Sequence, residues 1–418
     1  MPYTFIDLFA GCGGLSEGFL RSNHYQALAH IEWELPMVNT LRDRLVQAWH
    51  HTEDEARKRV IQFDIQKTNE LLNGNWGEVS VTQYGANNHP DIIARGLNGV
   101  IDNTHVNLII GGPPCQAYSI HGRATDANNM ENDYRNFLFE SFCRVVDSYR
   151  PDVFVFENVA GLLSAHPGGI PVTERIFNAF HEIGYQIKAP EDLHEALFNA
   201  VNFNVPQNRP RVIILGIPED STLNLDELYD SIINEQNFDH LLTVEDAIGD
   251  LPPLYPLGEE IHINRGKRSH IPNNDPNVTQ HEARYHNERD RGIYYHWVHD
   301  NMNHIPHQEM VHFYQEMTGH NTLFQKYKSL QWNMPSHTVV AHLSKDGHMF
   351  IHPDELQQRS IRIREAACLQ TFPRDFQFLG SNPYNYKMIG NAVPVNFAEA
   401  IANAINNVLV AHPEIPEI

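Results

Sequence analysis

A cysteine at residue 115 stands in the surroundings that a nucleophilic thiol needs. The run Gly-Gly-Pro-Pro-Cys-Gln at 111–116 follows the apolar segment 106–110, which predicts a strand. Open α/β sheets bind their ligands at the carboxyl ends of their strands. Two prolines fix the backbone directly before the thiol, and such rigidity suits a group that is aimed at one atom. Because the thiolate is the attacking form, the site should lower the pKa of Cys115 or supply a base.

A glycine-rich turn near the start of the chain indicates a nucleoside site. The run Phe-Ile-Asp-Leu-Phe-Ala-Gly-Cys-Gly-Gly-Leu at 5–15 predicts a strand, a tight turn and the start of a helix. Glu32 comes nineteen residues after Gly13, at the end of the next predicted strand, where a carboxylate can accept hydrogen bonds from ribose hydroxyls. Trp33 could lie against a flat base, and Asp64 could accept from an exocyclic amine. A turn with no ligand is the alternative for the glycines alone.

Two further groups of polar residues follow or precede apolar strands. The predicted strand 153–157 ends in Glu157, which could reach the same pocket as Cys115. Gln207, Arg209 and Arg211 precede the apolar segment 212–217, and strand alternation puts the three side chains on one face, where they could bind an anion or a carbonyl. An ordinary strand end and an exposed edge strand remain the alternatives.

Composition limits the class of protein. The chain has 418 residues, 41% of them apolar, and its longest apolar runs are far shorter than the roughly 20 residues of a membrane-spanning helix. The four cysteines are far apart and form no C-x-x-C pair, so we expect no zinc site, no disulfide framework and a reducing cytoplasm. The start of the chain has no basic or cleavable leader, and we expect no targeting segment. A net charge of −22 conflicts with a simple basic nucleic-acid binder.

Alternating apolar and amphipathic segments predict an α/β fold in the first half of the chain. The predicted strands are 3–9, 26–31, 60–63, 106–110, 153–157, 185–188 and 212–217. The helical segments are 15–21, 37–49, 136–149 and 172–183. This order predicts a mostly parallel sheet with helices on both faces. Residues 66–99 are polar and rich in Asn and Gly and are predicted to be a surface insertion, and the charged run 51–59 a solvated helix face.

The regular alternation of apolar and amphipathic segments ends at about residue 218. A short helix is predicted at 243–251, and residues 255–335 read as loop-like, with twelve of the 26 histidines between 255 and 345. Helical texture returns at 360–369 and 397–409. We therefore predict a catalytic and cofactor-binding domain at 1–240, completed by 384–418, and a second, smaller and irregular domain with a hinge at 241–383.

Taken together, these motifs resemble the bacterial DNA (cytosine-5-)methyltransferases, in the family's order and over nearly the whole chain. The family's motifs are matched by residues 7–14 (cofactor loop), Glu32 (ribose acid), 113–116 (Pro-Pro-Cys-Gln), 157–159 (Glu-Asn-Val) and 207–211 (Gln-x-Arg-x-Arg). Residues 133–139, 362–373 and 390–394 resemble the element after the catalytic loop, the organiser of the recognition domain and the closing motif. Residues 255–332 match no pattern, and in this family that region chooses the target.

The resemblance implies a Rossmann-like fold that uses S-adenosylmethionine, with no metal. The implied cofactor contacts are Asp7, Phe9, Gly11, Gly13, Gly14, Glu32, Trp33, Asp64, Ile65, Pro114, Leu138, Asn391 and Ala392. The implied catalytic residues are Cys115, Glu157, Gln207, Arg209 and Arg211. Gln116 and Ser119 are expected to contact DNA. Residues 255–345 are close to neutral, and their candidates for phosphate or base contacts are Arg265, Lys267, Arg268, Arg284, Arg289 and Arg291; each alone could also be a solubilising residue.

In the mechanism that the resemblance implies, Cys115 adds to carbon 6 of cytosine and carbon 5 attacks the methyl group of S-adenosylmethionine. Protonated Glu157, its pKa raised by burial, would stabilise N3, and Arg209 or Arg211 would meet O2. The base must be flipped out of the duplex, and residues 119–133 could form the closing loop. Low pH could add DNA affinity through the histidines.

The implied partner is double-stranded DNA, bound by a cytoplasmic monomer that joins the nucleoid when on DNA. The sequence leaves open whether a cognate restriction endonuclease acts separately. Three rival functions remain: a tRNA cytosine-5 methyltransferase, whose Cys-Phe-Thr signature is absent from the sequence; a non-catalytic DNA-binding regulator; and a Rossmann oxidoreductase, which explains only the glycine turn.

Overall fold

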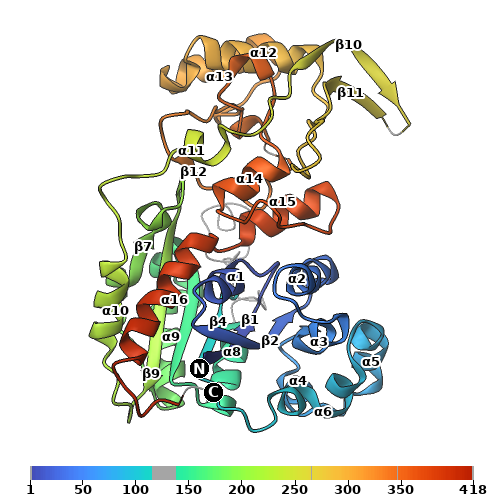
Figure 1. Cartoon of the computed structure of the whole chain (residues 1–418). Coiled ribbons are helices and arrows are strands. Elements are labelled where there is room, and N and C mark those ends of the chain that lie inside the picture. The colour runs from blue at the N-terminus through green and yellow to red at the C-terminus, as the bar shows by residue number, and fades with distance from the viewer. Residues whose placement is uncertain (1, 115–137, 265, 346, 417–418) are drawn as a thin grey trace. The chain divides into compact units, whose positions relative to one another are not determined.

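The chain folds into two compact units. A computed structural model describes residues 2–114, 138–264, 266–345 and 347–416. Unit 1 comprises Met1–Phe203, Arg209–Phe238 and Ala392–Ile418, and unit 2 comprises Asn204–Asn208 and Asp239–Asn391 (Figure 1). The predicted boundaries at 240/241 and 383/384 stay predictions, because this division follows contacts alone.

Unit 1 is built on an eight-stranded sheet. Its strands are β1 (Tyr3–Leu8), β2 (Tyr25–Glu32), β3 (Val60–Gln62), β4 (Leu108–Gly111), β5 (Val153–Val159), β6 (Tyr185–Gln186), β7 (Leu197–Asn199) and β9 (Pro210–Pro218). They lie in the order β3-β2-β1-β4-β5-β9-β6, and β7 also pairs with β9. The strands from β3 to β5 are parallel, whereas β9 is antiparallel to its three neighbours. The predicted α/β class with a mostly parallel sheet is confirmed.

The strand order reverses direction at β1. The chain first adds β2 and β3 on one side of β1 and then returns to place β4 on the other side. Such a switch point leaves a crevice outside the carboxyl ends of the two central strands, and that crevice is where doubly wound folds bind ligands. All six residues of β1 and all four of β4 are buried, so the two strands hold the edge of this crevice rigidly.

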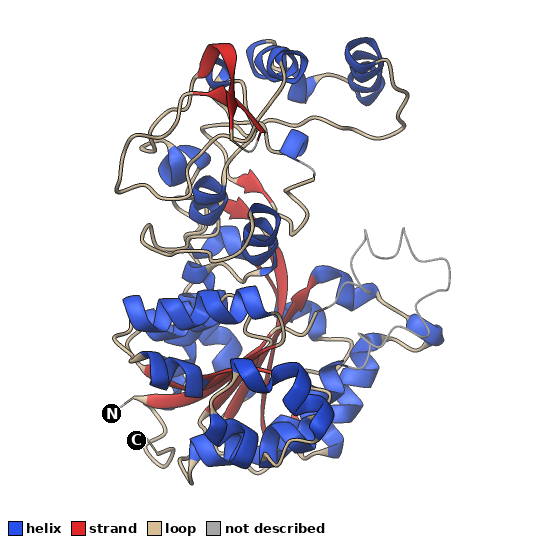
Figure 2. Cartoon of the chain, turned by 90° about the vertical axis from the view of Figure 1, so that its right-hand side faces the viewer, coloured by secondary structure: helices blue, strands red, loops and turns tan. Residues whose placement is uncertain are grey.

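Helices cover both faces of this sheet (Figure 2). The helices of unit 1 are α1 (Gly14–Arg21), α2 (Leu35–Gln47), α3 (Glu53–Arg59), α4 (Thr68–Asn73), α5 (Glu78–Tyr84), α6 (Pro90–Ile101), α8 (Leu138–Tyr149), α9 (Val172–Glu182), α10 (Leu225–Asn234) and α16 (Val395–Leu409). The predicted helix at 51–59 is confirmed as α3, in which only Ala56 is buried. The last helix, α16, packs against α1 and α10, so the end of the chain completes the cover of the first strand.

The segment 66–99 differs from its prediction. It was expected to be a surface insertion, and it instead contains the three helices α4, α5 and α6. Leu71, Trp76, Tyr84 and Leu97 are buried there, and the Trp76 ring stacks on Phe63 with 4.2 Å between centroids. Each helix is short and buries only one narrow face, so apolar residues are sparse in this segment. Their helical period was therefore not recognised among the polar residues.

Unit 2 is more regular than its sequence indicates. It contains α11 (Val244–Ile248), the hairpin β10 (Pro256–Ile263) and β11 (Gly266–His270), α12 (Glu288–His299), α13 (His307–Thr318), α14 (Ile363–Leu369), α15 (Asn382–Asn391) and the short parallel pair β8 (Gln207–Asn208) and β12 (Ser336–His337). The loop-like prediction for 255–335 was therefore wrong. The histidines and aromatic residues that suggested a loop include the buried core residues Tyr294 and Trp297, which pack with Ile293 and Met310.

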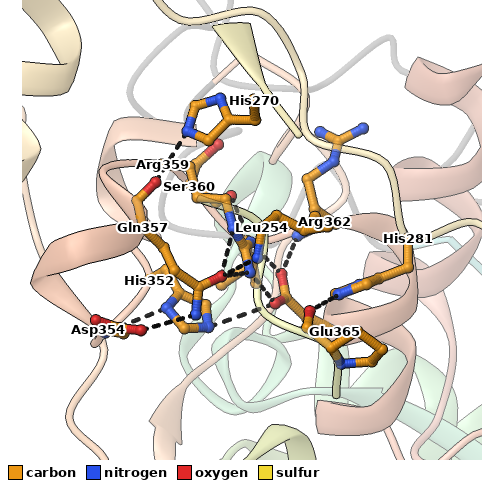
Figure 3. Close-up of polar contacts among 12 residues, drawn as sticks. Leu254, His270, His281, His352, Asp354, Gln357, Arg359, Ser360, Arg362 and Glu365 are labelled. Carbon is orange, nitrogen blue, oxygen red and sulfur yellow. Dashed lines mark hydrogen bonds and ion pairs between the residues drawn. The ribbon is translucent and has the colours of Figure 1, made fainter. Parts of the chain in front are cut away.

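A buried polar network holds the middle of unit 2 together (Figure 3). The guanidinium of Arg359 donates to both carboxylate oxygens of Glu365 at 2.7 and 2.6 Å, and His352 lies 3.4 Å from the same carboxylate. Gln357 accepts from Arg359 through its side chain and contacts the His270 ring at 2.9 Å through its backbone carbonyl. Because all these groups are buried and partnered, the network fixes the chain that carries them.

None of the helices among the described residues is both long and apolar enough to cross a membrane.

Candidate active site

The turn after β1 forms the first wall of the candidate site. Gly11 and Gly13 adopt φ values of 58° and 91°, a left-handed conformation that glycine reaches without steric cost. Phe9 adopts φ 60°, which is rare for a bulky side chain, and such backbone strain persists mainly at functional sites. Gly13 caps the N-terminus of α1, and a β-carbon at Gly11 would meet open space. The predicted glycine turn at the start of a helix is confirmed.

Asp7 stands at the end of β1, shortly before the glycine turn. Asp7 is buried at the end of β1, accepts a hydrogen bond from Ser16, and leaves its Oδ1 atom without a partner among the described residues. Burial, opposed by the Ser16 hydrogen bond and aided by the charge of Glu32, raises the pKa of Asp7 to about 7. Ser16 of α1 also contacts the buried His30 ring of β2 at 2.9 Å, so the hydroxyl group that holds Asp7 is itself held in place.

Glu32 joins the end of β2 to the glycine turn. Its carboxylate accepts from the backbone N–H of Gly11 at 2.9 Å and from those of Trp33 and Glu34 at 2.8 Å each. Burial raises the pKa of Glu32, and the three backbone hydrogen bonds oppose that rise. The carboxylate is thereby held in one orientation, with acceptor capacity remaining on Oε2 for a hydroxyl group.

Trp33 and Asp64 complete this half of the site. The Trp33 side chain is 52% exposed, an unusual state for an indole, while its backbone carbonyl is bound by Gln62. The backbone N–H of Phe63 donates to the Glu32 carbonyl at 3.0 Å, which places Asp64 and the buried Ile65 at the neighbouring strand end. Oδ1 of Asp64 accepts from the N–H of Gln66.

These residues fit S-adenosylmethionine. That cofactor carries a cationic sulfonium and an ammonium group beside an adenosine. The site offers an unpartnered buried carboxylate oxygen on Asp7, open space at Gly11, a fixed carboxylate on Glu32 and an exposed indole on Trp33. The positive charge, the ribose hydroxyl groups and the flat adenine of the cofactor therefore each have a matching group in the protein.

The ends of β4 and β5 form the second half of the site. Gly111 of β4 pairs with Phe156 of β5, so Gly112 and Glu157 follow side by side. A β-carbon at Gly112 would lie 2.7 Å from Oε2 of Glu157, so a side chain at residue 112 would force the Glu157 carboxyl group to move. Asn158 donates to the Pro113 carbonyl at 3.5 Å, which ties β5 to the diproline. The backbone that leads to Cys115 is therefore packed against Glu157.

Arg211 approaches Glu157 from the antiparallel strand. Because β9 runs against β5, its amino end lies at the carboxyl end of β5, and Arg211 pairs with Val159 in the register. Nε of Arg211 lies 2.9 Å from Oε1 of Glu157, with both side chains mostly buried. Burial lowers the pKa of Arg211, and the Glu157 charge opposes that change. The pair places a cation and a carboxyl group directly beside the diproline segment.

The Gln-x-Arg-x-Arg run does not form one face as predicted. Gln207 lies in β8 of unit 2, is fully buried, and bonds the Leu369 carbonyl at 3.1 Å and the N–H of Val339 at 2.9 Å. Arg209 is buried in unit 1 and donates to the Ala392 carbonyl at 2.9 Å. Strand alternation does not extend through the run, because Gln207 belongs to the two-residue β8 and Arg211 to the nine-residue β9. Arg211 contacts Glu157 directly, and the charge of Glu157 also acts on the buried Arg209.

The structure also describes four other predicted residues, each at an end of a helix or of a described segment. Pro114 is exposed at the end of the described segment, Gly14 and Leu138 are buried at the starts of α1 and α8, and Asn391 is exposed at the end of α15. Four predicted residues, and the predicted closing loop at 119–133, lie outside the described residues: Cys115, Gln116, Ser119 and Arg265.

The other three cysteines are unsuited to nucleophilic attack. Cys12, Cys143 and Cys368 are all buried. Burial raises the pKa of Cys12 and Cys143 far above the usual range of a thiol and that of Cys368 to about 11. None of these three thiols would yield a thiolate near neutral pH.

Four of the predicted DNA-contacting cations in unit 2 already have protein partners. The partners are Glu260 for Lys267 (2.8 Å), the Ser344 carbonyl for Arg284 (3.0 Å), Asp290 for Arg289 (3.0 Å) and the Leu257 carbonyl for Arg291 (3.2 Å). Arg268 has no such partner among the described residues. The prediction treated these cations alike, and the structure distinguishes them.

Sequence reasoning missed three residues that build the site. Gly112 was read only as part of a turn, and Asn158 only as part of a motif, yet they fix the Glu157 carboxyl group and the diproline. Ser16, which orients Asp7, was not considered. Gly112 and Asn158 lie next to predicted site residues in the sequence, and that position could have identified them. No feature of the sequence around Ser16 indicates its role.

Comparison with known proteins identifies the family. The sequence model for C-5 cytosine-specific DNA methylase matches residues 67–407. The chain is 33% identical to Type II methyltransferase M.Bpa9945I of Bacillus paralicheniformis, covering 97% of this chain and 99% of that protein. It is 30% identical to Type II methyltransferase M1.HphI of Haemophilus parahaemolyticus, with 97% and 87% covered.

Solved structures agree on the fold. A DNA modification methyltransferase encoded within a prophage (E. coli) superimposes with a TM-score of 0.58 at 22% identity, covering 98% of this chain and 99% of that one. The S. pombe Dnmt2 methyltransferase gives a TM-score of 0.53 at 13% identity, with the same coverage. The resemblance predicted from the motifs is confirmed: the chain belongs to the C-5 cytosine-specific DNA methylases, enzymes that methylate cytosine in DNA with S-adenosylmethionine.

Proposed function

We propose that this enzyme methylates carbon 5 of cytosine within a specific duplex sequence, through a covalent bond between Cys115 and a base turned out of the helix. The observation that carries the proposal is the packing of Glu157, paired with Arg211, against Gly112 at the end of β4. Three residues further along the chain stands the one cysteine that the buried-thiol argument does not exclude.

The chemistry requires an attacking thiolate because carbon 5 of cytosine is a poor nucleophile until a group adds to carbon 6. The Cys115 thiolate forms a bond to carbon 6, and the electron pair of the 5,6 double bond moves to carbon 5. Carbon 5 would use that pair to bond the methyl group, whose bond to the sulfonium sulfur breaks with its electron pair left on S-adenosylhomocysteine. A base would then remove the proton at carbon 5, and the electrons of that C–H bond would restore the double bond as the thiolate leaves. Each bond that the cysteine forms is broken again, so the enzyme is regenerated.

Glu157 and Arg211 act on the charge that develops in the ring. When the thiolate adds, negative charge moves toward N3 and O2, and a protonated carboxyl group at Glu157 would stabilise N3 while Arg211 meets O2. Their 2.9 Å contact supports this role, since it positions both groups before a base arrives. Arg209, bonded to the Ala392 carbonyl, would position the strand rather than touch the base.

Asp7, Glu32, Trp33 and Asp64 would hold the cofactor at the neighbouring strand ends. S-adenosylmethionine supplies an electrophilic methyl group when bound. Glu32 would accept from the ribose hydroxyls, Trp33 would cover the adenine, and the Asp7 carboxylate would face the cationic part. The glycines of the turn have no side chains, so the backbone itself can approach the cofactor closely.

The proposal is tested by trapping the adduct. The test uses duplex DNA with 5-fluorocytosine at the target position. Fluorine there replaces the proton that a base must remove from carbon 5, and a base cannot remove fluorine. An attacking cysteine therefore stays bonded to carbon 6. We expect the unaltered enzyme to form a DNA complex that survives denaturing electrophoresis, and Cys115→Ala to form none. The matched control Cys143→Ala removes a buried thiol and should trap DNA normally. Equal trapping by Cys115→Ala would contradict the proposal.

A methyl-transfer assay distinguishes the two possible substrates, duplex DNA and tRNA. Methyl transfer to duplex DNA and to tRNA, measured side by side with labelled cofactor, should strongly favour DNA. The Type II names of the relatives further support a cognate restriction endonuclease as a separate partner, with both enzymes acting on DNA in the cytoplasm. Protection of methylated DNA against cleavage by extracts of the source cells would test that partnership.

A further inference from the structure

A chain of three hydrogen-bonded side chains joins the two sides of the glycine turn. Asp7 precedes the turn in β1, Ser16 follows it in α1 and His30 lies in β2, and at most 1% of each residue is exposed. The Ser16 hydroxyl donates to Oδ2 of Asp7, and Nδ1 of His30 lies 2.9 Å from the same hydroxyl oxygen. Asp7 is opposite His30 in the strand register, so the chain ties two neighbouring strands to the start of the helix.

The hydrogen bonds of this chain have a direction. A hydroxyl group has one proton, and when Ser16 donates it to the Asp7 carboxylate, the Nδ1–H of His30 must donate to Ser16. The Phe5 ring lies edge-on to His30 with 6.0 Å between centroids and so restrains the imidazole. Burial lowers the pKa of His30 to about 3, which keeps the ring neutral near pH 7. The chain therefore delivers a donor to the Asp7 carboxylate and adds no charge of its own.

One oxygen of this carboxylate is left without a partner. Among the described residues, Oδ1 of Asp7 is buried and accepts no hydrogen bond, and no side chain forms an ion pair with it. On β4, the residue opposite Asp7 is the apolar Ile110. A buried carboxylate is costly unless it is paired, and a positive charge nearby would stabilise it. The missing partner is therefore a cation that the described side chains do not supply.

Titratable groups surround Asp7 on β2, in the turn and on α1. Burial raises the pKa of Asp7 to about 7, the hydrogen bond from Ser16 opposes that rise, and the charge of Glu32 adds to it. Cys12 in the turn stays a neutral thiol because burial raises its pKa. The Glu17 carboxylate on α1 already has an arginine partner. Asp7 therefore ionises near neutral pH, and the Ser16 hydroxyl group favours its charged form.

We propose that Ser16 and His30 are positioning residues for cofactor binding, which hold the Asp7 carboxylate in its charged form so that it attracts the cationic part of S-adenosylmethionine. The inference rests on the proposed function and concerns the cofactor site of the same reaction. Because Oδ1 is shielded from solvent, its charge acts through the groups of the turn without direct contact, and such an attraction is stronger in buried surroundings than in water.

The test follows cofactor affinity against pH by calorimetry on the whole enzyme. The unaltered protein should bind S-adenosylmethionine more tightly as the pH rises through 7, because Asp7 becomes charged. Ser16→Ala removes the donor that favours the charged form, so the midpoint of this rise should move up by about one to two pH units. At pH 7.5 the affinity should be about 3- to 25-fold lower, with kcat at saturating cofactor nearly unchanged. The profiles should converge at alkaline pH.

Matched variants separate this hydrogen bond from a packing effect. Ser22→Ala, just after α1, removes another buried hydroxyl group, which donates to the Phe19 carbonyl at 2.7 Å, and should leave the profile in place. His30→Leu removes the donor to Ser16 and should move the midpoint in the same direction by a smaller amount. His30→Asn supplies an amide donor and should restore the profile. The amino group of the cofactor titrates alike for every variant, so differences between profiles report on the protein.

A parallel series with S-adenosylhomocysteine, whose sulfur is uncharged, identifies the cationic group on which Asp7 acts. A shift with both ligands would assign the ammonium group, and a shift with S-adenosylmethionine alone would assign the sulfonium; both results support the inference. A shift with neither ligand would overturn it.

The remaining outcomes distinguish the inference from the proposed function. If the unaltered enzyme methylates cytosine in DNA but Ser16→Ala weakens cofactor binding equally at every pH, Ser16 has a structural role alone and the inference is wrong. If the unaltered enzyme neither binds S-adenosylmethionine nor methylates cytosine in duplex DNA, the proposed function fails and the inference fails with it.

Discussion

Gly112 and Glu157 are packed so closely that a β-carbon at residue 112 would lie 2.7 Å from Oε2 of the glutamate. The contact joins the end of β4, which leads to Cys115, to the end of β5, which carries the carboxyl group. The contact therefore holds the candidate acid against the backbone of Gly112, three residues before Cys115 in the sequence. Arg211 closes the arrangement from β9 at 2.9 Å.

Gly112→Ala should impair catalysis more than stability. The added methyl group must displace the Glu157 carboxyl group or the diproline backbone, and a misplacement of about 1 Å can cost roughly 100-fold in rate. We expect kcat to fall by about 10- to 100-fold while the melting temperature changes by a few degrees at most. The matched control is Gly292→Ala in α12, where a β-carbon meets open space and helix propensity should add up to about 1 kcal/mol of stability. Unchanged kcat in Gly112→Ala would argue against the contact.

Arg211 and Glu157 should act as one unit in catalysis. Arg211→Met removes the charge and leaves the Glu157 carboxyl group without its 2.9 Å partner. We expect kcat to fall by about 100- to 1000-fold, the usual cost of losing one preorganised electrostatic group. Glu157→Gln should cost a similar factor, and the double variant should lose much less than the product of the two. Fully multiplicative losses in this cycle would mean that the pair acts independently.

Trp33 should contribute to cofactor affinity without contributing to stability. Its side chain is 52% exposed, so the core does not depend on it, and an indole stacked on a base contributes about 1–3 kcal/mol. Trp33→Ala should therefore weaken S-adenosylmethionine binding by about 5- to 150-fold in calorimetry, with an unchanged melting temperature. Val79→Ala, another exposed apolar residue of unit 1, serves as the control. Equal affinity in both variants would remove Trp33 from the site.

The sequence predicted the sheet and the glycine turn because these depend on local signals. A buried strand that ends in a glycine turn fixes its own conformation, and the acidic residues follow at strand ends that the alternating pattern reveals. The sequence placed Glu32 at the next strand end but did not predict its 2.9 Å hydrogen bond from the N–H of Gly11. The signal is local in sequence although the contact is not.

The sequence failed where contacts depend on strand breaks and on tertiary pairing. Gln207 and Arg211 share a motif, yet the chain changes strands between them and the two side chains serve different units. Likewise, no spacing rule separates Arg268 from Arg291, since their difference lies in which carbonyl groups happen to be near. The helices of unit 2 were missed because their buried faces use Tyr, Trp and His rather than aliphatic residues.

Unit 2 should lose stability as the pH falls from 7.5 to 5.5. Burial lowers the pKa of His352 to about 3 and that of His270 to about 4, from the ordinary 6.5. Below pH 6.5 the unfolded chain binds protons that the folded chain excludes, so the free energy of unfolding decreases by about 1.4 kcal/mol per histidine at pH 5.5. The pKa of Glu365 is lowered, so its loss would begin only near pH 4.5, outside this window. Urea unfolding at the two pH values measures the change.

A substitution in the same network assigns this loss to one ring. The Nδ1 atom of His352 accepts from the N–H of Asp354 at 3.1 Å, and an asparagine oxygen can take over that bond without titrating. His352→Asn should therefore reduce the pH-dependent loss by about 1.4 kcal/mol, whatever its effect at pH 7.5. His312→Asn, at a 70% exposed side chain on α13, should leave the loss unchanged. If the His352→Asn protein loses as much stability as the unaltered protein, protonation of this ring does not limit unit 2 in mild acid.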